Sequence, residues 1–86
     1  MSDQTPLSPE EARAAVHQAI RSIIPDADFD QLADDASFRS ELELDSLDFL
    51  SFVEQLSAST GIRIDEDDYP HLVCTASAIA FLTGSP

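Results

Sequence analysis

Ser46 is the residue of this chain whose type and position best suit chemistry. It lies in the segment Asp45-Ser46-Leu47-Asp48, where Asp45 is a good helix N-cap and Asp48 falls at the third helical position. A hydroxyl in the first turn of a helix lies beside backbone N–H groups without internal partners, so a phosphate ester there would be stabilised. The local residues alone favour the simpler interpretation that Ser46 merely begins a helix.

Nothing in the sequence indicates that Ser46 is an activated nucleophile. It has no G-x-S-x-G elbow around it, and His17 and His71 lie on separate segments and are interpreted as ordinary surface histidines. The single cysteine, Cys74, excludes an internal disulfide, and its apolar neighbours predict a buried, inert thiol. We therefore predict no catalytic residues and no enzyme.

The acidic run Asp65-Glu66-Asp67-Asp68 resembles a calcium-binding loop only superficially. Pro70 stands where such a loop has its sixth-position glycine, and no glutamate occupies the twelfth position. We predict a solvated acidic surface and no metal site.

Charge and length restrict the class of protein. Four arginines and no lysine oppose 17 carboxylates in 86 residues, which gives a net charge of −13. Such a surface repels nucleic acid and anionic lipid and attracts basic proteins. A hydrophobic fraction of 43% is too high for a disordered acidic tail. We predict one domain over 1–86 with flexible ends at 1–7 and 84–86, cytoplasmic and monomeric, without a secretion signal or membrane span.

Helical periodicity predicts the elements that must position Ser46. A first helix begins with Ser8 as cap and Glu11 completing a capping box, and it ends before Pro25. Residues 26–45 form a long acidic connection, which apolar anchors should hold against the core. The second helix follows Asp45 and ends at Gly61.

The C-terminal part predicts two further helices. Pro70 limits the one over 65–72 to a turn or two, and the last is capped by Thr75 and ends before Gly84. The fold class is therefore all-α, a small four-helix bundle with three longer helices and one short third helix.

The pattern of residues around Ser46 resembles the acyl carrier protein family. The matching motifs are Asp35-Ala36-Ser37-Phe38, then Leu42, then Asp45-Ser46-Leu47-Asp48. Together with the length, the acidity and the helix order, they identify the chain as a phosphopantetheine-binding carrier of the bacterial, stand-alone type.

The resemblance implies a covalent cofactor and a set of partners. A phosphopantetheinyl transferase using coenzyme A and magnesium would attach 4′-phosphopantetheine to Ser46, with Asp45 and Leu47 flanking the site. Acyl-loading and acyl-processing enzymes with basic docking patches would then act on acyl groups held as thioesters. Fatty acid, specialised lipid and secondary metabolite synthesis all fit. A peptidyl or polyketide carrier, or an acidic helical adaptor without a cofactor, stays an alternative.

The resemblance also implies two sets of residues around the helix that follows Ser46. One set is the core that could admit an acyl chain, in a cavity that phenylalanines should restrict: Phe49, Phe52, Val53, Leu56, Ile64 and Ile79, with Leu32 beside them. The other faces partners: Leu47, Asp48, Glu54, Asp65, Glu66, Asp67 and Asp68.

The chain also departs from the family pattern. Glu43 replaces a common glycine, and the exposed face of the second helix has few glutamates. These departures predict a specialised carrier.

Overall fold

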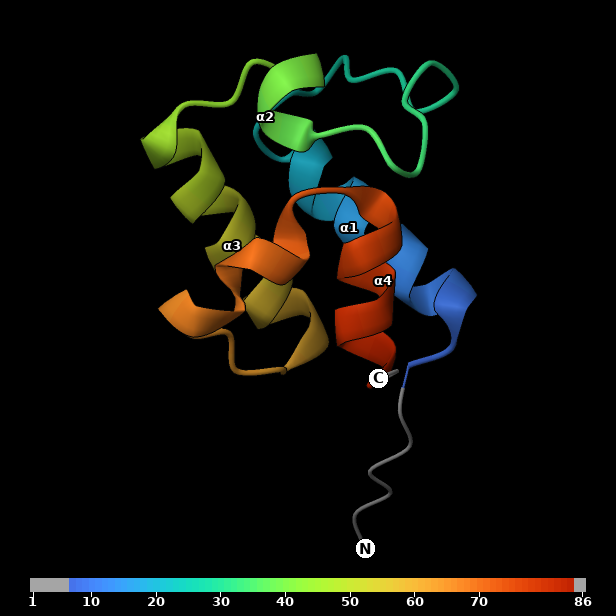
Figure 1. The fold of residues 1–86 in the computed structure, drawn as a ribbon, viewed down its shortest axis with the longest axis vertical. Coiled ribbons are helices and arrows are strands. Elements are labelled where there is room, and N and C mark those ends of the chain that lie inside the picture. Colours follow the sequence, from blue (N-terminus) through green and yellow to red (C-terminus); the bar gives the residue numbers. More distant parts are fainter. Residues whose placement is uncertain (1–6, 85–86) are drawn as a thin grey trace, which may run out of the picture.

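The computed structural model describes residues 7–84, and all regular structure in that range is helical. The elements in chain order are α1 (Pro9–Arg21), α2 (Phe38–Glu41), α3 (Ser46–Thr60), the 3₁₀ helix η1 (Glu66–Leu72) and α4 (Thr75–Thr83) (Figure 1). The predicted all-α class is confirmed. Within the same residues, no helix is long and apolar enough to cross a membrane.

Helix α1 forms as its sequence predicts. The Ser8 N–H donates to Glu11 Oε1 at 3.0 Å, and the Glu11 N–H donates to Ser8 Oγ at 3.1 Å, which completes the capping box. The apolar stripe of Ala12, Val16 and Ile20 is buried. It faces α3 and α4, against which α1 packs.

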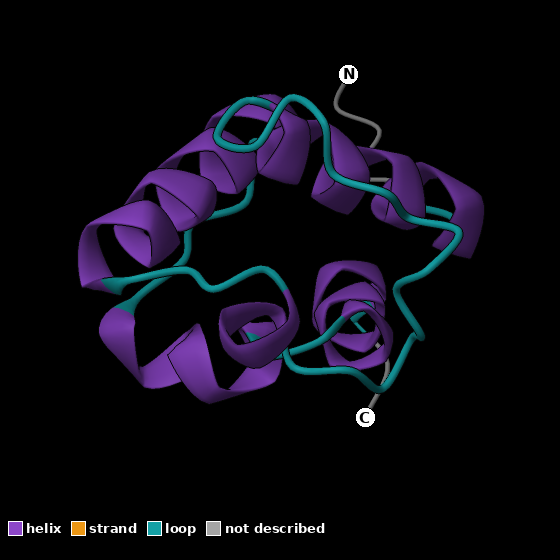
Figure 2. Cartoon of the chain, turned by 90° about the horizontal axis from the view of Figure 1, so that it is seen from above, coloured by secondary structure: helices purple, strands orange, loops and turns teal. Residues whose placement is uncertain are grey.

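One core holds the helices together, and the helices surround it when the molecule is seen from above (Figure 2). Phe38 of α2 and Phe52 of α3 are fully buried and meet edge to face, with ring centroids 5.4 Å apart. Leu56 and Leu72 fill the space beside them without exposure to solvent. Burial of each such side chain contributes about 1.5–3 kcal/mol, so these few residues stabilise much of a small domain.

The connection from α1 to α3 is ordered, and it contains a helix that the sequence did not predict. This helix, α2, is one turn long and is anchored by Phe38, whose N–H donates to the Val73 carbonyl at 2.8 Å. The Asp34 carbonyl accepts a bond of 2.9 Å from the Ala76 N–H. These two backbone bonds attach the connection to the segment that leads into α4.

Side chains of α1 also hold this connection. The Arg13 guanidinium binds both carboxylate oxygens of Asp34, at 2.9 and 2.8 Å, and this hydrogen bonding lowers the pKa of Asp34. The Phe29 ring stacks on His17 at a centroid distance of 3.8 Å, with the Arg21 guanidinium 5.0 Å from the same ring. His17 was interpreted as an ordinary surface histidine; the structure corrects its exposure, because the residue is half-buried in this stack.

The start of α4 differs from the prediction by one residue. Cys74 is the N-cap, and its N–H donates to Ser77 Oγ at 3.4 Å. Thr75 cannot serve as the cap, because it is the first helical residue and its side chain is buried. Cys74 is half-buried, whereas the sequence predicted a buried thiol; the inertness of this thiol stays a prediction.

Of the ends predicted to be flexible, 1–6 and 85–86 lie outside the described residues. Leu7 packs against the core and Gly84 caps α4.

Candidate functional site

Ser46 is the first residue of α3, and its side chain is exposed. Asp45 is the N-cap, as predicted. Its Oδ1 accepts a bond of 2.8 Å from the Asp48 N–H, and its carbonyl accepts one of 2.9 Å from the Phe49 N–H. The N–H groups of Ser46 and Leu47 find no acceptor among residues 7–84, and the positive end of the helix dipole lies here. This turn can therefore receive an anionic ester on the serine oxygen.

The two residues before Asp45 fix how α3 begins. Leu44 is buried in the core. Glu43 has a φ of 53°, and among the described residues it is the only one other than glycine with a positive φ. This left-handed conformation turns the chain sharply from α2 into α3, so Leu44 points into the core while Ser46 stays outside.

A groove of about 490 Å³ begins at Ser46 and runs between α3 and η1. We call it the apolar groove; its lining residues are Arg39, Ser46, Phe49, Leu50, Glu66, Tyr69, Pro70 and Val73. The rings of Phe49 and Tyr69 meet edge to face at 5.3 Å. Leu50 and Val73 leave large apolar surfaces exposed. An apolar chain attached near Ser46 could lie along this groove.

The residues predicted to form an acyl pocket do not all line this groove. Phe49 does, whereas Phe52, Val53 and Leu56 are buried in the core. The remaining members, Ile64, Ile79 and Leu32, are half-buried and pack against the core elsewhere. Sequence reasoning missed the other side of the groove, because it depends on how η1 docks on α3.

Arg39 was also missed, although its charge is unusual in this place. Arg13 and Arg63 form ion pairs, with Asp34 and Asp65 at 2.8 and 3.1 Å, and Arg21 lies over the ring of Phe29. Arg39 is exposed, has no ion pair among residues 7–84, and lines the apolar groove together with Ser46. It supplies a positive charge to the groove from α2.

The groove lining contains no histidine, so no imidazole base stands beside the Ser46 hydroxyl there. Within 7–84, no three His, Cys, Asp or Glu side chains group closely enough to hold a metal ion. The geometry thus suits attachment at an exposed hydroxyl.

The residues predicted to face partners are spread over two elements. Leu47 is 74% exposed at the start of α3, beside half-buried Asp48. Glu54 is exposed further along the same helix. Of the acids in 65–68, Glu66 lines the apolar groove, whereas the Asp65 carboxylate pairs with Arg63 and the Asp68 carboxylate accepts from the Asp65 N–H at 3.0 Å.

Two comparisons with known proteins agree with this geometry. Residues 14–75, well over half of the chain, match the family model described as phosphopantetheine attachment site. An acyl carrier protein of Lactobacillus johnsonii is 31% identical over 55 residues, which cover 64% of this chain and 69% of the relative.

Proposed function

The chain belongs to the acyl carrier protein family, and from that premise we propose that Ser46 carries its 4′-phosphopantetheine. The family's members are carriers and not enzymes, and the prosthetic group is covalently bound. Their partners include phosphopantetheinyl transferases and acyl-processing enzymes. Cytoplasmic location and a monomeric state stay predictions from the sequence.

The observation that carries the proposal is the exposed Ser46 hydroxyl in the first turn of α3. The free N–H groups of Ser46 and Leu47 supply hydrogen-bond donors for a phosphodiester on that oxygen. Arg39 adds a positive charge along the apolar groove. When bound, the group supplies a terminal thiol that holds acyl groups as thioesters.

Intact-mass spectrometry tests the attachment. Incubation with coenzyme A, magnesium and a phosphopantetheinyl transferase should add the mass of one phosphopantetheine. The Ser46→Ala variant should gain nothing, while the matched control Ser51→Ala, on the exposed face of the same helix, should load normally. Loading of Ser46→Ala, or a modified peptide without Ser46, would refute the proposal.

We further propose that acyl groups are held along the apolar groove and not deep in the core. The packing of Phe49 supports this, because its ring lines the groove beside Tyr69 and also contacts the buried ring of Phe52. NMR of a long-chain acyl form should show the largest shifts at groove residues such as Leu50 and Val73. Large shifts of core residues such as Leu56, or a crystal structure with the chain fully buried, would contradict it.

The surface of α3 supports a dedicated pathway. Ser51, Gln55 and Ala58 are exposed there, which leaves Glu54 as the exposed acid of this helix beside half-buried Asp48. Each exposed ion pair contributes only about 0–1 kcal/mol, so docking to enzymes that recognise an acidic helix should be weakened without being abolished. Expression of this protein should therefore restore growth only poorly in a strain that lacks its main acyl carrier. Full restoration would count against a specialised role.

A further inference from the structure

Arg39 of α2 is an exposed cation without a partner inside the described chain. Among residues 7–84 its guanidinium makes no ion pair, hydrogen bond or ring contact. The other arginines do have such partners, which are Asp34, Asp65 and the ring of Phe29. Carboxylates are abundant in a chain with a net charge of −13, so an unpaired arginine is the exception. Its charge stays available to an anion from outside the polypeptide.

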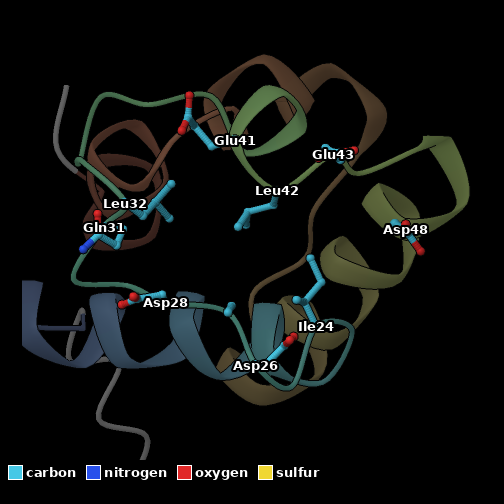
Figure 3. A pocket seen from close by; sticks show the side chains of 10 residues that line it. Ile24, Asp26, Asp28, Gln31, Leu32, Glu41, Leu42, Glu43 and Asp48 are labelled. Carbon is cyan, nitrogen blue, oxygen red and sulfur yellow. The ribbon is translucent and has the colours of Figure 1, made fainter.

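The acids that follow Arg39 in the sequence lie around a different hollow. Glu41 and Glu43 line this second hollow, of about 560 Å³, and Figure 3 shows their side chains at its edge. Arg39 lines the apolar groove instead. Among the described residues that line the apolar groove, Glu66 of η1 is the one acid. The carboxylates of α2 and of the turn after it therefore leave the charge of Arg39 uncompensated.

The family supplies an anion for this groove independently of Arg39. A 4′-phosphopantetheine is joined to its serine through a phosphodiester, and Ser46 lines the same groove as Arg39. A guanidinium can bind two phosphate oxygens at once with its planar fork of donors. The many carboxylates of this protein repel a further anion, and a cation beside that anion offsets the repulsion.

We propose that Arg39 binds the phosphodiester of the phosphopantetheine on Ser46 and so directs the arm along the apolar groove. The N–H groups of Ser46 and Leu47 meet the phosphodiester at the start of α3, and the guanidinium of Arg39 meets it from α2. An arm held at its root in this way is retained over Leu50 and Val73, which expose apolar surface along the groove. The inference rests on the proposed attachment at Ser46.

Phosphorus NMR of the loaded full-length chain tests the contact, because the phosphodiester then holds the sole phosphorus atom. The matched control is Arg63→Gln, which removes the same charge from an exposed arginine outside the groove. Arg39→Gln should shift the phosphorus signal, and Arg63→Gln should leave it at the wild-type position. Arg39→Lys should shift it only partly, because an ammonium keeps the charge and lacks the fork of donors. Intact mass confirms that every variant is fully loaded.

The direction of the arm is measured in the same samples. Nuclear Overhauser effects between the paired methyl groups of the arm and the methyls of Leu50 and Val73 should weaken about threefold in Arg39→Gln, as expected for an exposed ion pair. Arg63→Gln should leave them unchanged. Raising the ionic strength should move the wild-type phosphorus signal toward that of Arg39→Gln, because salt screens the contact.

Three results would overturn the inference. One is an equal phosphorus shift in Arg39→Gln and Arg63→Gln, which would show a general effect of charge. Another is an arm whose contacts with Leu50 and Val73 do not depend on Arg39. The third is a loss of these contacts in Glu66→Gln as large as in Arg39→Gln, which would assign Arg39 to an ion pair across the groove.

Failure of this inference and failure of the proposed function give different results. A chain that gains no phosphopantetheine on Ser46 refutes both. A chain that is loaded on Ser46, with a phosphorus signal that is indifferent to Arg39, overturns this inference alone.

Discussion

Glu43 stands at a backbone position that glycine would occupy more easily. Its φ of 53° lies in the left-handed region, and no other non-glycine residue in 7–84 has a positive φ. Replacing Glu43→Gly should therefore stabilise the fold. The substitution removes the contact between a Cβ and the neighbouring carbonyl oxygen that makes this region unfavourable for other residues.

The expected gain follows from two opposing effects. A non-glycine residue costs about 1–2 kcal/mol in this conformation. Glycine lowers the stability by about 0.5–1 kcal/mol, because its more flexible unfolded state loses more entropy on folding. The net gain in unfolding free energy is about 0.5–1 kcal/mol, which corresponds to a rise in Tm of about 2–8 °C for a domain of this size.

Thermal and urea unfolding followed by circular dichroism at constant pH and salt measures this gain. Glu43→Ala is the matched control, because it removes the same carboxylate and keeps the backbone cost. The glycine variant should be more stable than the alanine variant, with equal m-values. Equal stability of the two would refute the argument from backbone conformation.

Two further predictions concern the positioning of α3 and of the connection. Asp45→Ala should lower stability by about 1 kcal/mol through loss of the N-cap, while Asp45→Asn should retain most of the wild-type stability. Thermal unfolding compares the two variants, and an equal loss of stability in both would contradict a capping role. Burial, followed by the charges of Arg13 and Arg21, lowers the pKa of His17. The unfolded chain then binds the proton more readily than the folded chain does. The stability that neutral His17 contributes is therefore fully present above the ordinary pKa of histidine, and it is lost as pH falls through the lowered pKa of the folded state. Between about pH 7.5 and pH 5.5, stability should fall more steeply in the wild type than in His17→Gln, and equal slopes would exclude this linkage.

The sequence predicted best the features that depend on neighbouring residues. Two of the three caps that it assigned to the longer helices, Ser8 and Asp45, are confirmed, because a side chain and an N–H three residues later are enough to form them. The third, Thr75, was wrong by one residue. Gly61 ends α3 with a φ of 72°, as its freedom to adopt the left-handed conformation predicted. The exposure of Leu47 followed from the helical period alone.

Features that depend on contacts between distant segments were missed. Helix α2 has four residues, too few for a periodic pattern, and its place depends on the burial of Phe38 and on the bond to Val73. The apolar groove needs η1 to dock beside α3, so Tyr69 and Val73 could not be assigned to it from local patterns. The stack of His17 on Phe29 joins α1 to the connection in the same way.

The position of α2 has a consequence for the order of folding. Arg39 lines the apolar groove, and Glu41 lines the second hollow together with Leu32 and Leu42, so this one-turn helix contributes to the walls of both. Its first N–H is bonded to Val73, and the preceding loop is bonded to Ala76. These contacts span much of the chain and form only after a long loop has closed, which makes them late events. On the ribosome, Ser46 would emerge well before its surroundings exist.

We expect the amides of Phe38 and Ala76 to gain protection together, after those of α1 and α3, in pulsed hydrogen exchange during refolding. Earlier protection of Phe38 would show that α2 forms by itself.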